Sequence, residues 1–411
     1  MRPVLPSPGM KSRPAASALC LAVLLATNPF GAEPFPRATP ESVGLNPAKL
    51  QEATDLMNRS VAEKRVAGGV AAVARRGKLV YLQAVGVQDL ESRAPMTDRS
   101  LFRIYSMTKP VTAVAAMMLR ERGRFALTDP VAKFIPEFKG VVVSSPDGAT
   151  RPPAREITVQ DLLLHTSGLN HRTSQLYQRE KIRSRAQTLP QFIANIVRVP
   201  LMDDPGARYR YSESPTVVGR LIEIWSGQPL DRFMATEIFQ PLGMTDTTFW
   251  VAPEQASRFT TRYALSNGTL VVNEIEEVPF TVRPALLEGA VGLVSTVPDF
   301  LRFSQMLLNK GELAGVRLLS AKTVDTMTAN GLTDAMVKER NGMGWGLGNV
   351  EVVVDPGRQK QPANRGEYGW NGSAGTYFWN DPSTEMITIL MTQFADRLPG
   401  QFKAVVQQAV Q

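Results

Sequence analysis

The sequence predicts an α/β (α+β) fold in which strands from both ends of the chain form one antiparallel sheet, flanked by helices from both chain ends. Strand-like apolar runs occur near the N-terminus and again after residue 342, while segments of helical period fill most of the region between them. The chain has 411 residues, of which 43% are hydrophobic, so it can form a sizeable core. We expect a sheet domain from residues 33–100 and 290–411, and an inserted helical domain from residues 101–289.

The N-terminal part of the predicted sheet domain begins with a helix. Asn46 is a suitable N-cap, and Pro47 fits the first helical position because it needs no backbone donor there. Two apolar runs follow at 69–74 and 79–85, separated by a polar turn, and they indicate a pair of strands.

Helix signals dominate the middle of the chain. A capping-box pattern at 158–161 predicts a short helix that ends at 167–168. Further helices are expected at 215–226, closed by Gly227, and at 230–239. An amphipathic helix at 298–309 then leads back to the sheet.

Strand character returns after residue 342. Alternating glycines at 342–348 are followed by a strand and not by a helix, which argues against a nucleotide-binding loop. We expect these glycines to let another backbone approach closely. Segments 376–379 and 385–393 predict a hairpin, and a terminal helix completes the chain.

The first 32 residues resemble a signal peptide. Lys11 and Arg13 form a basic region, and residues 15–26 form an apolar segment that is too short to span a bilayer. No later stretch is apolar for 18 residues, so no membrane span is expected after removal of the signal. The sequence therefore predicts an exported protein, either periplasmic or secreted.

The charge pattern gives no indication of a nucleic-acid partner. The net charge is +8, and the densest basic cluster, at 172–185, contains no nucleic-acid-binding motif. We interpret this cluster as a solvated loop, with a basic rim that steers anionic substrates as the alternative.

Cysteine and histidine are scarce. Cys20, the single cysteine, lies in the predicted leader, and the two histidines are His165 and His171. This composition predicts no disulfide, no thiol nucleophile and no dedicated metal site. It also argues against a Ser-His-Asp triad, so a serine enzyme of this composition would need another base.

Ser106 and Lys109 provide such a pairing. If Ser106 lies in the first turn of the helix that follows, the two side chains share one face and the amine can reach the hydroxyl. A serine hydroxyl needs a nearby base to become a nucleophile at neutral pH. The spacing alone is expected about once by chance, so its meaning depends on the rest of the chain.

Two further segments supply this context. Tyr211 precedes a predicted helix in a basic segment, and a tyrosine held among cations can act as a general base. Tyr209 remains an alternative for this role. Residues 368–376 form a glycine-rich approach to a strand, where a backbone N–H can point at a developing oxyanion.

In this order, the three segments resemble the serine β-lactamase and penicillin-binding-protein superfamily, whose pattern is Ser-x-x-Lys, Tyr-x-Asn and a Lys-Thr-Gly-like strand. The chain is most similar to class C β-lactamases and family VIII carboxylesterases. Residues 157–169, 241–244, 292–296 and 344–348 also match this branch. The resemblance runs from about residue 40 to the C-terminus and implies a β-lactamase/transpeptidase-like fold.

The resemblance also implies roles for individual residues. Ser106 would form an acyl-enzyme, Lys109 would share its proton network, and Tyr211 would act as base and acid. The backbone N–H groups of Ser106 and Ser373 would form the oxyanion hole. No cofactor is implied, and His165 is expected to be structural.

Two positions depart from the lactamase pattern. Glu213 replaces the expected asparagine, and we expect it to turn away or to pair with a cation such as Arg210. Trp370 replaces the expected lysine, next to Asn371 and Gly372 in the predicted substrate-binding strand. An indole offers apolar area in place of a charge, which favours neutral acyl groups and resembles family VIII esterases.

The resulting hypothesis is a carboxylesterase that acts on small-molecule esters of short to medium chain length. A class C-like β-lactamase or D,D-peptidase is the first alternative, including as a side activity. A non-catalytic, penicillin-binding-like binding protein is the second. The sequence contains no signal that specifies an oligomeric state or the natural substrate.

Overall fold

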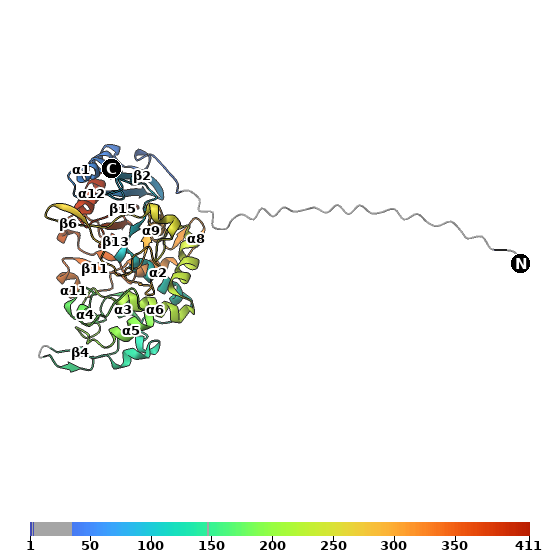
Figure 1. Ribbon diagram of the computed structural model, residues 1–411, viewed down its shortest axis with the longest axis vertical. Coiled ribbons are helices and arrows are strands. Elements are labelled where there is room, and N and C mark those ends of the chain that lie inside the picture. Colours follow the sequence, from blue (N-terminus) through green and yellow to red (C-terminus); the bar gives the residue numbers. More distant parts are fainter. Residues whose placement is uncertain (2, 4–34, 146–147) are drawn as a thin grey trace.

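A computed structural model describes residues 1, 3, 35–145 and 148–411 of the chain (Figure 1). Apart from residues 1 and 3, the predicted signal peptide lies outside the described residues. The central element is a seven-stranded antiparallel sheet with the strand order β11-β12-β13-β14-β15-β1-β2. Its strands are β1 (Gly68–Arg75), β2 (Lys78–Gly86), β11 (Met343–Trp345), β12 (Glu351–Val353), β13 (Tyr368–Gly372), β14 (Thr376–Asp381) and β15 (Met386–Thr392).

Strands from the two ends of the chain meet within this sheet. β1 pairs with β15 from Gly69 opposite Thr392 to Arg75 opposite Met386. Every residue of both strands is buried, which explains their continuous apolar character. The prediction of one sheet formed by both chain ends is confirmed.

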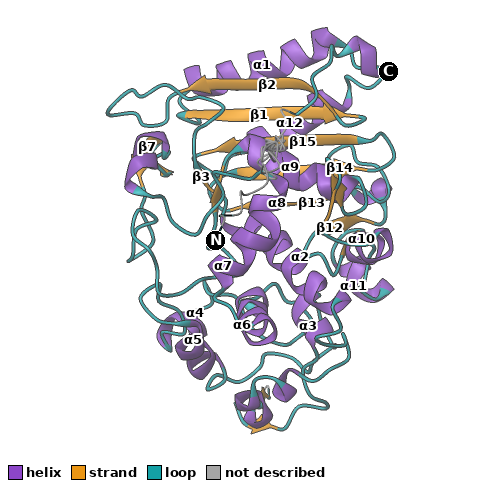
Figure 2. Cartoon of the chain, turned by 90° about the vertical axis from the view of Figure 1, so that its right-hand side faces the viewer, coloured by secondary structure: helices purple, strands orange, loops and turns teal. Residues whose placement is uncertain are grey.

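The two faces of the sheet pack against different helices. Val70 and Ala72 of β1 join the main core, which includes α2 (Thr108–Glu121) and α9 (Val297–Leu308). Ala71 and Val73 point to the other face and join a second core with α1 (Pro47–Ala62) and α12 (Leu398–Gln407). This alternation follows from the two-residue period of a strand. Figure 2 shows α1 with the sheet at one end of the molecule and α3 to α6 at the other.

The connection between β2 and the C-terminal strands is mostly helical. After α2 come α3 (Val159–Leu163), α4 (Gln175–Arg179), α5 (Leu189–Ile196), α6 (Ser214–Ser226), α7 (Leu230–Met234) and α8 (Gln240–Leu242). The capping box at Thr158 is present, although the helix ends at Leu163 and not at 167–168. The predicted helix at 230–239 is α7 continued by a π-helical turn at Ala235–Phe239.

Two further helices and four short strand pairs complete the α-helices and strands of the described residues, which also contain several short 3₁₀ helices. The helices are α10 (Ala321–Thr328) and α11 (Asp334–Glu339). The pairs are β3 (Phe102–Arg103) with β8 (Val294–Ser295), β4 (Val143–Ser144) with β5 (Thr150–Arg151), β6 (Tyr263–Ser266) with β7 (Thr269–Val272), and β9 (Glu312–Leu313) with β10 (Val316–Arg317). Because α10 and α11 lie within 290–411, that segment is not purely a sheet region, and the proposed domain boundaries stay a prediction.

The glycines around β11 have the role that their spacing indicates. A Cβ atom at Gly346 would lie 2.2 Å from the carbonyl oxygen of Met327, at the end of α10. At Gly344 it would lie 2.4 Å from the side-chain oxygen of Asn330. The predicted close approach of another backbone is therefore confirmed at Gly346, where a side chain would push α10 away from the sheet, while at Gly344 a side chain would meet Asn330 in the loop after α10.

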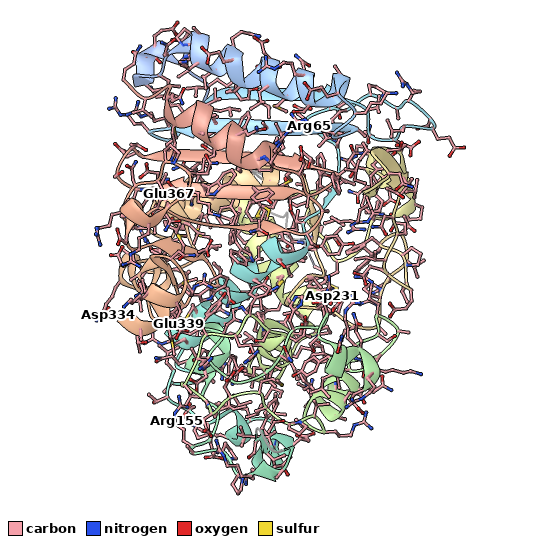
Figure 3. The ribbon with its side chains drawn as sticks, turned by 90° about the vertical axis from the view of Figure 1, so that its left-hand side faces the viewer. Arg65, Arg155, Asp231, Asp334, Glu339 and Glu367 are labelled. Carbon is pink, nitrogen blue, oxygen red and sulfur yellow. The ribbon has the colours of Figure 1, made fainter. Side chains whose placement is uncertain are left out.

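Ion pairs tie distant segments together at the periphery. Arg65, labelled near the sheet end of the molecule in Figure 3, donates to Asp396 at 2.6 Å. This pair joins the segment before β1 to the segment before α12. None of the helices in the described part of the chain is long and apolar enough to cross a membrane.

Candidate active site

Ser106 lies in a short 3₁₀ turn, Tyr105–Met107, that connects β3 to α2. The preceding residue, Tyr105, has φ +38°, a left-handed conformation that is unusual for a bulky side chain. The sharp turn leaves Ser106 partly exposed while the residues on either side of it are buried. Such backbone strain persists only where the surrounding structure holds it in place.

Lys109, one turn further along, is buried and faces Ser106. Its Nζ atom donates to Ser106 Oγ at 3.1 Å and to the carbonyl oxygen of Ala290 at 2.9 Å. Only 1% of Lys109 is exposed, so its amine depends on nearby protein groups for hydrogen bonds. The geometry expected from the spacing of Ser106 and Lys109 is present.

Tyr211 completes the group from the start of α6. Lys109 Nζ lies 4.7 Å from the centroid of the Tyr211 ring. The Tyr211 hydroxyl accepts a hydrogen bond of 3.1 Å from the indole N–H of Trp370 on β13. The ring of His171 stacks on the Tyr211 ring at 5.4 Å. Tyr211 therefore bridges the lysine and the tryptophan.

Tyr209 has a different environment. It is packed between Trp345, at 5.5 Å, and the guanidinium of Arg340, which lies 3.9 Å from its ring centroid. Burial raises the pKa of Tyr209 well above its usual range, so its phenol stays protonated. The structure thus brings Tyr211, and not Tyr209, next to Lys109.

The end of β13 comes close to the Ser106 turn. A Cβ atom at Gly372 would lie 2.2 Å from the carbonyl oxygen of Ile104, so only glycine fits there. Ser373 follows directly and is exposed. The N–H of Ser106 belongs to a first helical turn, whose donors have no acceptor within the helix. The backbone of residues 372–373 thus lies next to the Ser106 turn, where the oxyanion hole is predicted.

Aromatic side chains form one wall of the site. Trp370 meets Trp345 edge to face at 4.6 Å, and the Trp345 indole N–H donates to the Leu163 carbonyl at 3.2 Å. A pocket of about 530 Å³ adjoins this wall and includes Trp370 and Asn371 in its lining, but not Ser106, Lys109 or Tyr211. This wall therefore offers the Trp370 ring and the Asn371 amide at the place where the lactamase pattern has the lysine of its Lys-Thr-Gly strand.

His165 lies behind Tyr211 and is completely buried. Its Nδ1 atom accepts the backbone N–H of Ser212 at 3.2 Å and contacts the Ser212 hydroxyl at 3.0 Å. Burial, reinforced by the charge of Lys109, holds the pKa of His165 well below its usual range. A neutral imidazole that organises the Tyr211 segment agrees with the structural role implied by the resemblance.

Glu213 differs from expectation. Its carboxylate is buried and accepts a hydrogen bond of 3.3 Å from the Thr216 hydroxyl. Arg210, the predicted partner, pairs with Asp203 at 2.6 Å instead. The predicted pairing of Glu213 with Arg210 is therefore wrong. Arg210 is partly exposed, whereas Glu213 is buried.

The interpretation of residues 172–185 as a solvated loop is also wrong for three of its arginines. The side chains of Arg172, Arg183 and Arg185 are 12%, 14% and 0% exposed. They pair with Glu276 and Glu288, which the sequence places about 100 residues away. Sequence reasoning missed this pairing because only tertiary packing brings the charges together.

His171 is another residue that the pattern did not single out. Its pKa is lowered chiefly by burial and secondarily by the Lys109 and Arg172 cations, against the opposing charge of Glu213. The only available signal was its proximity in sequence to the basic cluster. Among the residues that the structure describes, no group of histidine, cysteine, aspartate or glutamate could hold a metal ion.

The antiparallel sheet with its helical insertion, and a serine in contact with a buried lysine beside a tyrosine, define the class of serine hydrolases with a β-lactamase-type fold. The chain belongs to the beta-lactamase family, whose model matches residues 53–409.

Comparison with known proteins shows relatives with several names. Protein Rv1367c of Mycobacterium tuberculosis is 34% identical, over 83% of this chain and 89% of that protein. Esterase EstB of Burkholderia gladioli is 28% identical, over 90% of this chain and 97% of that protein. A putative D-alanyl-D-alanine carboxypeptidase of Escherichia coli K12 is 25% identical, over 91% and 89%.

Solved structures confirm the fold. EstCE1, a hydrolase with promiscuous acyltransferase activity, superposes with a TM-score of 0.77 at 26% identity, covering 88% of this chain and 98% of that chain. Simvastatin synthase (LovD) from Aspergillus terreus has a TM-score of 0.76 at 22% identity, covering 88% and 98%. The predicted β-lactamase/transpeptidase-like fold is thus confirmed.

Proposed function

We propose that the protein is a serine carboxylesterase that cleaves short- to medium-chain esters of small molecules through an acyl-enzyme on Ser106. The observation that carries this proposal is the position of Tyr211, between the Lys109 amine and the Trp370 indole. Trp370 places an apolar group where an anion-binding cation would favour β-lactams or peptide C-termini.

In the proposed acylation step, Ser106 Oγ attacks the ester carbonyl carbon and transfers its proton to the Lys109–Tyr211 pair. The negative charge moves to the carbonyl oxygen, which accepts hydrogen bonds from the backbone N–H groups of Ser106 and Ser373. The carbon–oxygen ester bond then breaks, and the leaving alkoxide takes a proton from Tyr211.

Deacylation repeats these steps with water as the nucleophile. Tyr211 takes a proton from the water that attacks the acyl carbon, and Ser106 leaves with a proton supplied through Lys109. Trp370, Asn371 and Gly372 line the substrate in this proposal. The indole N–H also fixes the orientation of the Tyr211 hydroxyl.

The relatives support an ester substrate. EstB is named an esterase and EstCE1 a hydrolase, and both cover most of this chain.

The proposal includes export to the periplasm or the medium, for which the leader pattern at residues 1–32 is the support. An intact-mass measurement of the mature protein from the cell envelope or medium tests the export.

Hydrolysis of p-nitrophenyl butyrate tests the ester activity. Ser106→Ala should reduce kcat by about 1000-fold or more, because the nucleophile is lost. Ser373→Ala is the matched control: it removes an exposed hydroxyl and keeps the backbone N–H, so activity within about threefold of wild type is expected. Wild-type activity in Ser106→Ala would end the proposal.

A class C-like β-lactamase or D,D-peptidase activity is the second candidate, favoured by the relative named as a putative carboxypeptidase. Turnover of nitrocefin at a rate comparable to the ester would support it, especially if Trp370→Lys increased that turnover. A non-catalytic binding protein would instead fail to label at Ser106 with a fluorophosphonate probe while remaining folded.

A further inference from the structure

Behind the Ser106 turn lies a group of buried hydrogen-bond donors that have no partner. Among the described residues, five buried arginine nitrogens lack a hydrogen-bond acceptor, and all five lie in this one region. They are Arg103 Nε, Arg172 Nη1, Arg185 Nη1 and Nη2, and Arg262 Nε. The hydroxyl of Tyr105, also buried, is a sixth unpaired group at the same place.

Tyr105 is the centre of this group. The guanidinium carbons of Arg172 and Arg262 lie 5.7 and 5.9 Å from its ring centroid. The charges of Arg103 and Arg185 also act on the Tyr105 hydroxyl, and the nearby carboxylate of Glu276 opposes them. Two guanidinium groups therefore lie against the ring of the residue that directly precedes Ser106, and two more are near enough to influence its hydroxyl.

A shared aromatic partner connects the same side chains. Phe280 meets Tyr105 edge to face at 5.8 Å. The guanidinium of Arg185 lies 4.0 Å from the Phe280 ring centroid, and that of Arg103 lies 5.7 Å from it. Ring faces contribute to the stability of buried guanidinium groups, but they do not satisfy the N–H donors.

The carboxylates of the region do not balance its cations. Arg183 is fully paired, since it contacts both oxygens of Glu288 at 2.5 and 2.7 Å and Glu276 at 2.6 Å. By contrast, Arg185 Nη1 is 3.9 Å from Glu288, and Arg172 Nη1 is 3.7 Å from Glu276. The region holds five arginines and four glutamates: Arg103, Arg172, Arg183, Arg185 and Arg262, with Glu274, Glu276, Glu277 and Glu288.

A pocket leads to this region from the surface. It has a volume of about 500 Å³ and is lined by Arg172, Arg183 and Glu276 of the buried network. Tyr177 and Lys181 form part of its outer wall. The pocket lining includes Arg172 but not Tyr105, Arg103, Arg185 or Arg262, so Arg172 is the guanidinium of this group that a small solute in the pocket can contact.

We infer that the guanidinium groups around Tyr105 bind a small monovalent anion, of the size of a halide or formate. One negative charge matches the excess of one cation, and a halide or formate accepts several N–H and O–H hydrogen bonds at once. Unpaired buried charges are costly, and charge-assisted hydrogen bonds are stronger than neutral ones. Water could satisfy single donors but would leave the excess charge in place.

Bromide is the probe for this inference, because its anomalous scattering identifies it in a crystal. In wild-type crystals grown with sodium bromide, we expect an anomalous peak within hydrogen-bond distance of Tyr105 Oη and at least two of the four guanidinium groups. Density at this place that fits water, with no anomalous signal at high bromide concentration, would overturn the inference.

Thermal unfolding supplies a second test in solution. At equal ionic strength, 100 mM sodium bromide should raise the Tm of the wild type by about 2 °C relative to sodium gluconate, whose anion is too large for the site. Arg172→Met should lose this difference. Arg179→Met is the matched control, because Arg179 lies on the same segment but is 73% exposed, and it should keep the difference.

These experiments need no turnover, so their outcome is independent of the proposed esterase activity. If Arg172→Met fails to fold, the crystallographic test on the wild type still decides. Equal Tm values for the wild type in bromide and gluconate, together with no anomalous peak, would show that the site binds no anion.

Discussion

The two sides of the candidate active site are built differently. On the α2 side, Ser106 lies in the 3₁₀ turn that leads into α2 and Lys109 in the first turn of α2, and Lys109 is held by hydrogen bonds to Ser106 and to the Ala290 backbone. On the opposite side, Tyr211 and Trp370 come from segments about 160 residues apart, and ring contacts with a single hydrogen bond hold them together.

This difference suggests separate roles for the two sides: the α2 side in the reaction itself, and the aromatic side in the choice of substrate. A lysine tied to backbone groups has little freedom to change without loss of the reaction. A wall of edge-to-face and tilted rings can be remodelled by one substitution, because a single hydrogen bond joins Tyr211 to Trp370. We therefore expect changes on the α2 side to abolish activity and changes on the aromatic side to reduce or redirect it.

Lys109→Met tests the rigid side and should have the largest effect. Methionine keeps most of the side-chain volume but cannot donate to Ser106 or exchange its proton, so kcat for p-nitrophenyl butyrate should fall by about 1000-fold. Lys133→Met, at a side chain that is 56% exposed, is the control and should behave like wild type. A decrease in kcat of less than tenfold in Lys109→Met would contradict the expectation that the α2 side is essential for the reaction.

Tyr211→Phe should come next, with a loss of about 100-fold in kcat, because the substitution removes the phenol that transfers protons. Tyr209→Phe is matched in chemistry and lies close by in the structure. Since Tyr209 lies against Arg340 and not against Lys109, removal of its hydroxyl should change kcat by less than about threefold. A larger decrease in kcat for Tyr209→Phe than for Tyr211→Phe would assign the proton-transfer role to Tyr209.

Trp370→Phe should cause a smaller effect, a decrease of about three- to tenfold in kcat with KM nearly unchanged. Phenylalanine keeps an aromatic contact with Trp345 but loses the N–H that donates to Tyr211. Steady-state kinetics with p-nitrophenyl acetate and butyrate would measure this. An increase in KM alone would instead assign Trp370 to substrate binding without an effect on Tyr211.

The smallest effect concerns stability and the histidine behind Tyr211. Because burial lowers the pKa of His165 below 6.5 in the folded state, the unfolded chain binds a proton that the folded chain excludes. The free energy of unfolding should therefore fall as the pH drops below about 6.5, by up to about 1.4 kcal/mol per pH unit from this group. His171, with its lowered pKa, acts in the same direction.

Urea unfolding at pH 7.5, 6.5 and 5.5 measures this dependence. In His165→Gln the group cannot titrate, so the decrease between pH 6.5 and 5.5 should be smaller than in the wild type. An identical decrease in both proteins would assign the acid sensitivity to other groups.

Much of the fold could be predicted from the sequence, because the local sequence signals and the tertiary packing favour the same elements. The strands β1 and β2, the cap of α1 at Asn46 and the glycine that ends α6 all lie within one or two residues of expectation. The proximity of Ser106 and Lys109 also followed from a helical period alone.

The rest could not be predicted because it depends on contacts between distant segments. Arg183 looks like a solvated cation until Glu288 is placed beside it by the fold. Glu213 has no local signal that distinguishes a buried carboxylate from an exposed one, and its hydroxyl partner Thr216 is a common neighbour in helix starts. His171 becomes a partner of Tyr211 only through tertiary packing.

The contact between Gly372 and the Ile104 carbonyl has a consequence for the order of biosynthesis. Gly372 and Ile104 are far apart in the sequence. Their contact is what brings Ser373, the second proposed oxyanion donor, close to Ser106, the first. A nascent protein that has already folded α2 but still lacks β13 therefore carries a serine without electrophilic assistance. In the proposed mechanism, Ser106 therefore becomes reactive only after β13 has joined the sheet.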